Sequence, residues 1–246
     1  MHQRYGRRIP LTSQQGMLLA SLSWLVPTVT VILSMSVHLI GGARTFPIFI
    51  SEADHPGPER FIFTAGIIIT GVLQMLYSWH LYHSLTTEKP RLWTVACFIG
   101  LVVGFHVILV AYYNMYDHIN PHIYAAMISF GGGIIWAITG HIALGTSSVR
   151  GAKLRKMGIS LSLIALVVMV VSFQYAVGTF DTNGLTTEEF LNNAQSGINF
   201  AGPAEYILVS GLLMALASFR QDLAGQQKNQ QADSETIADQ INYNDI

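Results

Sequence analysis

The chain has a single cysteine, Cys97, and few charged residues, which make up 11% of its 246 residues. One cysteine excludes a disulfide framework within the chain. The net charge of −1 and the lack of a basic stripe with interleaved aromatic residues argue against nucleic-acid binding. No internal repeat of the kind that marks inverted-repeat transporters is recognisable. Hydrophobic residues, by contrast, make up 51% of the chain.

These hydrophobic residues gather in six long stretches. Each is long enough for an α-helix to cross a hydrocarbon core of about 30 Å at a rise of about 1.5 Å per residue. A membrane β-barrel has shorter segments of alternating polarity. The sequence therefore predicts an all-α, polytopic membrane protein built as a bundle of six transmembrane helices. The predicted spans are 17–40, 61–82, 93–113, 121–146, 157–178 and 200–219.

The basic residues fall almost entirely on one side of these spans. Eleven of the thirteen lysines and arginines lie in the N-terminal segment, the second and fourth connections and the C-terminal tail. Only Arg44 and Arg60 lie on the opposite side. By the positive-inside rule, both termini are predicted to be cytoplasmic. Residues 1–220 are expected to form the membrane domain, and residues 221–246 a polar, mobile cytoplasmic tail.

Polar residues gather in the loops of the opposite, outer side. The first outer loop, residues 41–60, is rich in proline and glycine, which predicts a stiff segment with turns. In the second outer loop, Asn120-Pro121 favours a helix N-cap followed by proline at the first helical position. The topology places both loops on one membrane face, where they are candidates for binding a lipid or another ligand. The candidate ligand-binding residues are Ser51, Glu52, Asp54, His55, Glu59, Asn114 and Asp117.

Glu205 is the only acidic residue inside a predicted span. A charge at the centre of a membrane helix costs ~2.5–3.5 kcal/mol on insertion scales, so a functional role is the first interpretation. A structural hydrogen bond to a neighbouring helix is the alternative. His122, in the first turn of the fourth span, is predicted to point at the outer interface. Glu205 and His122 are therefore the candidate catalytic residues, with the histidine as general base and the glutamate as its orienting partner.

Four outer-side residues also carry side chains of the types that zinc prefers. Pro121 is expected to interrupt the helical spacing of His118 and His122, so no metal site is assigned to them. No cofactor is expected either. The four metal-ligand candidates are His38, Asp117, His118 and His122.

The first outer loop resembles the Frag/DRAM/Sfk family at Phe46-Pro47-Ile48-Phe49-Ile50-Ser51-Glu52 and at the following Pro56, Pro58, Glu59 and Phe61. Pro121-His122, at the opening of the fourth span, and Ala204-Glu205-Tyr206, within the last span, are also similar to the family pattern. This family includes damage-regulated autophagy modulators, the post-GPI-attachment factor and the Cwh N-terminal domain. The resemblance implies an autophagy-type or GPI-anchor lipid-remodelling function. It also implies a eukaryotic endomembrane of the Golgi or lysosome type, or the plasma membrane.

Three functions remain open. The first is a protein that binds, senses or remodels membrane lipids in an outer-face polar pocket, with those lipids as its partners. The second is a non-enzymatic scaffold or regulator, in which the same polar residues hold the loop onto the bundle. The third is a metal-dependent lipid hydrolase, because the scattered ligands are similar to those of ceramidase-type membrane hydrolases. A retinal protein is excluded because no lysine lies inside a span. A proton-coupled transporter is disfavoured because Glu205 and His106 are too few buried ionisable residues.

Overall fold

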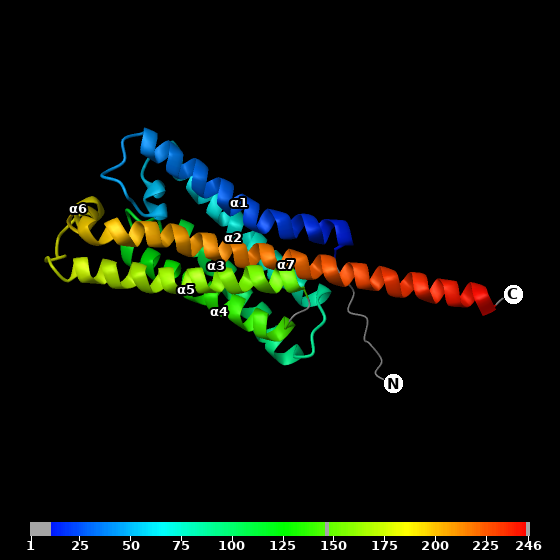
Figure 1. Cartoon of the computed structure of the whole chain (residues 1–246). Coiled ribbons are helices and arrows are strands. Elements are labelled where there is room, and N and C mark those ends of the chain that lie inside the picture. Colours follow the sequence, from blue (N-terminus) through cyan, green and yellow to red (C-terminus); the bar gives the residue numbers. More distant parts are fainter. Residues whose placement is uncertain (1–10, 146–147, 245–246) are drawn as a thin grey trace.

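The computed structural model describes residues 11–145 and 148–244, with side chains up to residue 226. Within these residues all regular secondary structure is helical (Figure 1). Six of the helices are long and apolar enough to cross a membrane, which confirms the predicted bundle of transmembrane helices. The elements are α1 (Ser13–Ile40), the 3-10 helix η1 (Ile50–Asp54), α2 (Pro58–Ser84), α3 (Pro90–Tyr112), α4 (Ile119–Leu144), α5 (Val149–Val177), α6 (Thr187–Asn193) and α7 (Gln195–Asn244).

The helices begin two to eight residues earlier than the predicted spans, because polar and charged residues extend them beyond the hydrocarbon core. At the start of α1, Thr12 and Gln15 form a capping box, in which each side chain accepts a hydrogen bond from the other residue's backbone N–H. At the end of α4, Gly145 has a φ of 58°, a conformation suited to glycine, and the helix stops at Leu144. Residue 146, the predicted end of this span, lies outside the described residues.

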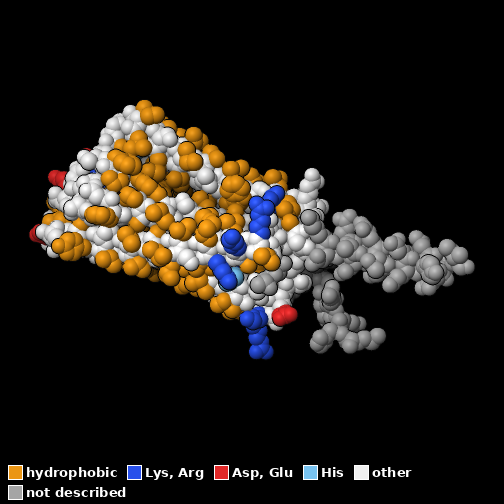
Figure 2. Space-filling model, viewed as in Figure 1, with side chains coloured by type: hydrophobic (Ala, Val, Ile, Leu, Met, Phe, Trp, Pro, Cys, Tyr) orange, Lys and Arg blue, Asp and Glu red, His pale blue; other side chains and the backbone are white. Residues whose placement is uncertain are grey.

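The two ends of the bundle differ in chemistry. We call the end that carries η1 and α6 the outer end, following the orientation predicted from the charges. Figure 2 shows lysines and arginines gathered towards the opposite, inner end, while hydrophobic side chains cover the flank between the two ends. Large apolar side chains on this flank are exposed, among them Ile164 and Val171 of α5 at 65% and 62%. Such an apolar belt matches the lipid environment of a transmembrane bundle.

Helices α5 and α7 pack closely along their length. A Cβ atom on Gly158 would lie only 2.4 Å from the carbonyl oxygen of Gly211, so the two backbones approach at a distance that only glycine permits. One turn further on, Ser162 Oγ donates a hydrogen bond of 3.0 Å to the carbonyl oxygen of Leu208. Small residues and an interhelical hydrogen bond are the usual means of joining membrane helices.

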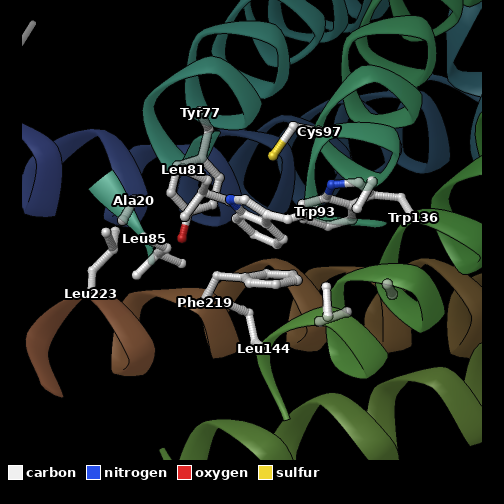
Figure 3. Close-up of a cluster of buried hydrophobic side chains, with 14 of the residues drawn as sticks. Ala20, Tyr77, Leu81, Leu85, Trp93, Cys97, Trp136, Leu144, Phe219 and Leu223 are labelled. Carbon is white, nitrogen blue, oxygen red and sulfur yellow. The ribbon is translucent and has the colours of Figure 1, made fainter. Parts of the chain in front are cut away.

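An aromatic cluster fills the inner half of the bundle (Figure 3). The ring of Phe219 from α7 lies 4.7 Å from Trp136 of α4 and 6.2 Å from Trp93 of α3, measured between centroids. Arg155 of α5 is fully buried beside this cluster, with its guanidinium 4.4 Å from the centre of the Phe219 ring. Its Nη1 donates to Asp222 Oδ2 at 2.7 Å, so α5 and α7 share a buried ion pair at this end.

Helix α7 does not end near Phe219, where the last predicted span ends. It continues through the polar segment to Asn244 and projects beyond the other helices (Figure 1). Residues 221–244 are therefore helical; the sequence predicted a polar, mobile cytoplasmic tail here, and its mobility and location stay predictions. Alanine and glutamine are common in this segment, and both have good helix propensity.

Candidate functional site

The first outer loop folds down onto the bundle instead of extending away from it. Ile48 and Ala53 are completely buried. Three side chains of α7 bind backbone groups of the loop: Glu205 Oε2 accepts the Ile50 N–H at 2.6 Å, the Tyr206 hydroxyl donates to the carbonyl oxygen of Ile48, and Gln195 Nε2 donates to that of Pro47 at 3.1 Å. The loop is thus held by hydrogen bonds that replace those its buried backbone would make with water.

Glu52 is fully buried within this loop and serves two purposes. Its two carboxylate oxygens accept hydrogen bonds from Arg44, at 2.5 Å from Nε and 2.6 Å from Nη2, in a bidentate ion pair. Its Oε1 also accepts the Phe49 N–H at 2.6 Å, which caps η1. Arg44 in turn donates to Gln195 at the start of α7. Glu52 therefore stabilises the loop internally and connects it to the last span.

Asp54, at the end of η1, joins the loop to the connection between α3 and α4. Its Oδ2 accepts the Met115 N–H at 3.2 Å, and its Oδ1 lies 3.8 Å from Arg60 Nε. Arg60 Nη1 lies 3.7 Å from Asp117, which also receives a hydrogen bond of 2.7 Å from Asn114 Nδ2. Burial raises the pKa of Asp54 to about 6, although the positive charge of Arg60 opposes this effect.

Asp54 is expected to make the protein less stable as the pH rises from about 4 to about 6. The carboxyl of the unfolded chain loses its proton near pH 3.9, whereas the buried carboxyl keeps it up to about pH 6. The folded state therefore binds more protons than the unfolded state in this window. The stability that proton binding adds to the folded state is lost as the pH rises. An Asp54→Asn variant should show a flatter dependence of the thermal midpoint between pH 4.5 and 7.5 (roughly the titration range). The exposed control Asp181→Asn should follow wild type; equal slopes for wild type and Asp54→Asn would contradict this assignment.

His122 is buried, contrary to the predicted position at the outer interface, with 2% of its surface exposed. Helix α4 begins at Ile119, with His118 and not Asn120 as the N-cap, so Pro121 lies within the first turn. Proline fits there because the first N–H groups of a helix have no intrahelical partner. The Nδ1–H of His122 donates to the carbonyl oxygens of Tyr113 and Val110, at 2.8 and 3.1 Å. It thereby satisfies carbonyls at the end of α3.

The structure divides the predicted site residues into separate groups. Glu205 and Glu52 bind the loop backbone, while His122 binds α3, so the two candidate catalytic residues have different partners. Ser51 Oγ contacts Met115 Sδ at 3.4 Å. Of the four candidate metal ligands, only His38 lies in a group of potential ligands within the described residues, and its companions there are His55 and Glu59.

Beneath the loop, the centre of the bundle contains a cavity of about 160 Å³. Its walls are almost entirely apolar and come from α1, α2, α3, α4 and α7, while η1 and Glu205 close its outer end. Val107, Val110, Leu212, Gln74 and Trp136 are among the lining side chains. No pattern in the sequence predicted this cavity, since its walls come from five spans.

Two lining side chains carry polar atoms that find no partner among the described residues. Gln74 Oε1 and Trp136 Nε1 are both buried, at 5% and 2% exposure of their residues, and neither forms a hydrogen bond. Such groups cost about 1–3 kcal/mol each when they are left unsatisfied in a protein interior. The signal for Gln74 was present in the sequence as an isolated amide within an apolar span, but nothing there indicated which neighbours it would meet.

A second, smaller pocket of about 80 Å³ lies at the outer end, between the end of α1 and the start of α2. His38, His55 and Glu59 line it, together with Arg44, Tyr116 and Glu188. No lining residue is shared between this pocket and the central cavity. The outer face therefore carries a polar pocket that is separate from the apolar cavity in the bundle interior.

Comparison with known proteins gives one match. No curated protein and no solved structure matches this chain significantly. A family model described as "Protein of unknown function (DUF998)" matches residues 18–219, which include all six predicted spans except the first residue of span 17–40. Nothing links this match to the Frag/DRAM/Sfk family, so the resemblance seen in the first outer loop was misleading, and the autophagy and GPI-anchor functions it implied are withdrawn. The chain belongs to the DUF998 family.

Proposed function

We propose that this protein binds a neutral membrane lipid by taking part of its hydrocarbon chain into the central cavity. The observation that carries the proposal is the cavity itself, about 160 Å³ in volume and lined by apolar side chains of five transmembrane helices. Cavities lined by leucine, isoleucine and phenylalanine exclude water and bind apolar molecules. Binding is proposed in preference to catalysis because His122 and Glu205 have different partners.

The volume limits how much of a lipid enters. An apolar cavity of about 150 Å³ accommodates a benzene molecule, so this one has room for a short hydrocarbon segment and not for a complete lipid. The remainder of the molecule would stay in the bilayer.

The polar atoms of the cavity indicate the chemical class of the lipid. Trp136 Nε1–H can donate a hydrogen bond and Gln74 Oε1 can accept one. A hydroxyl group offers both an acceptor for the indole N–H and a donor for the amide oxygen. Glu205 is the only ionisable side chain in the lining, so no positive charge is present to hold a phosphate. These features favour a neutral lipid with a hydroxyl group, such as a long-chain alcohol, a sterol or a diacylglycerol.

The proposal predicts that Val107→Phe lowers lipid occupancy about tenfold, which corresponds to a loss of ~1.4 kcal/mol of binding free energy. The added ring fills the cavity that the hydrocarbon segment would occupy. The measurement is photocrosslinking of purified protein with a long-chain alcohol that carries a diazirine in mid-chain. Mass spectrometry should locate the label at lining residues such as Val110 and Leu212.

Val95→Phe provides the matched control, because it makes the same substitution at a half-exposed position of the same helix. It should be labelled like wild type. Gln74→Leu should weaken labelling by the alcohol while leaving labelling by a hydrocarbon of equal length unchanged. Equal labelling of Val107→Phe and Val95→Phe would rule out the cavity as a lipid site.

A scaffold or regulatory function is the second candidate. One observation favours it: Glu52, Asp54 and Glu205 are already engaged in holding the loop to the bundle. In that case substitutions at these residues would change stability without changing bound lipid.

A further inference from the structure

The cluster of His38, His55 and Glu59 has the composition of a metal site. One ligand atom from each residue can be chosen so that all three lie within 4.8 Å of one another. His38 comes from the end of α1, His55 from the turn after η1, and Glu59 from the first turn of α2. Two imidazoles and one carboxylate form a set that binds Zn²⁺ in many proteins and leaves a fourth position open.

The distances within the cluster are also close to those between metal ligands. His38 Nδ1 forms a long hydrogen bond of 3.3 Å with Glu59 Oε1, and His55 Nδ1 lies 3.6 Å from the same oxygen. A charge-assisted hydrogen bond between imidazolium and carboxylate is shorter, about 2.7–2.9 Å. Zinc bonds of about 2.0–2.2 Å in a tetrahedral arrangement place neighbouring ligand atoms roughly 3.3–3.5 Å apart. The two histidine nitrogens already stand close to that separation from the carboxylate.

The charge environment of Glu59 also favours a bound metal ion. Its residue is only 6% exposed, and among the described residues its ion-pair partners are the two histidines, with no lysine or arginine. The nearby arginines are engaged elsewhere, Arg44 with Glu52 and Arg60 with Asp54. A buried carboxylate needs a compensating cation, which a divalent metal between neutral imidazoles would supply.

We infer that His38, His55 and Glu59 bind a Zn²⁺ ion at the outer end of the bundle, with its fourth coordination position open to the adjoining pocket. That pocket, about 80 Å³ in volume, has room for a water molecule or a small oxygen ligand on the metal. Arg44 and Glu188 also line it and contribute one charge of each sign. The ion would join the ends of α1 and α2 to the loop between them. This inference goes beyond lipid binding and does not depend on it, because the two pockets share no lining residue.

The test uses the full-length protein in detergent, with any affinity tag removed and bound metal stripped by a chelator. Zn²⁺ alone is then added and the protein is dialysed. We expect one zinc per chain by elemental mass spectrometry, and a visible absorption band typical of tetrahedral coordination when Co²⁺ replaces Zn²⁺. His55→Ala and Glu59→Gln should weaken zinc binding by at least about tenfold.

His118→Ala is the matched control, since it removes an exposed histidine from the same membrane face without touching the cluster. It should bind zinc like wild type. His55 is half-exposed in a loop, so its variant tests the site even if Glu59→Gln folds poorly. Wild-type protein that retains no zinc at micromolar free metal overturns the inference. Equal zinc affinity of His55→Ala and His118→Ala also overturns it.

Discussion

Replacement of Arg155 by alanine is expected to lower the free energy of unfolding by about 3–5 kcal/mol, the usual cost of removing one partner of a buried ion pair. Arg155 and Asp222 are both completely buried, and Arg155 Nη1 donates to the aspartate at 2.7 Å and to Ser218 Oγ at 3.2 Å. Without the arginine, Asp222 would lose the cation that donates to its Oδ2 inside the protein, and Phe219 would lose the guanidinium that lies 4.4 Å from its ring centre. Unfolding of the detergent-solubilised protein in a denaturing detergent would measure the loss.

Lys153→Ala is the control for this experiment, because Lys153 is an exposed basic residue of the same helix. It should change the free energy of unfolding by less than about 0.5 kcal/mol. The double variant Arg155→Met with Asp222→Leu should be clearly more stable than Arg155→Ala, since it leaves no uncompensated charge. An Arg155→Ala protein as stable as Lys153→Ala would show that this ion pair contributes nothing to the packing of α5 on α7.

Replacement of Glu52 by alanine is expected to have a comparable effect at the outer end, again about 3–5 kcal/mol. It leaves Arg44 without its bidentate partner and the Phe49 N–H without an acceptor. Because the loop covers the central cavity, its release should also expose the segment 41–57 to proteolysis. Limited proteolysis and denaturing-detergent unfolding would report the two effects separately.

Asp181→Ala serves as the control, since it removes an exposed carboxylate from another outer connection. It should leave both measurements close to those of wild type. Glu52→Ala protein with wild-type stability and an intact loop would contradict the structural role. If Glu52→Ala loses stability but keeps the photocrosslinked lipid, the loop is not needed to retain the ligand.

The fold is predictable from the sequence because membrane insertion depends on properties of short segments. The length of each apolar stretch identified the spans, and polar ends such as Thr12 with Gln15 account for the longer helices observed. Polarity separated residues 221–246 from the membrane spans, whereas the continuation of α7 to Asn244 depends on helix propensity, which persists in that segment.

The site is much less predictable, because its contacts join residues that are distant in sequence. Glu205 was identified as an isolated acid in a span, but its partner, the Ile50 N–H, is 155 residues away. Gln74 and Trp136 share a cavity only through the packing of several helices. The misleading family resemblance can be explained by the local structure of the first outer loop. Glu52 of the matched loop sequence caps η1, so a similar short pattern can recur wherever a loop of this shape folds onto a helix bundle.

Helix α7 gives the molecule a continuous mechanical element from one membrane face to the other. Its 50 residues correspond to about 75 Å of helix at about 1.5 Å per residue. Near its start, Gln195, Glu205 and Tyr206 hold the outer loop, and towards the inner end Asp222 pairs with α5. A force applied to the projecting inner portion of α7 would therefore act on the same helix whose side chains bind the first outer loop. Rotation or axial sliding of α7 would move its loop-binding side chains and the inner ion pair together.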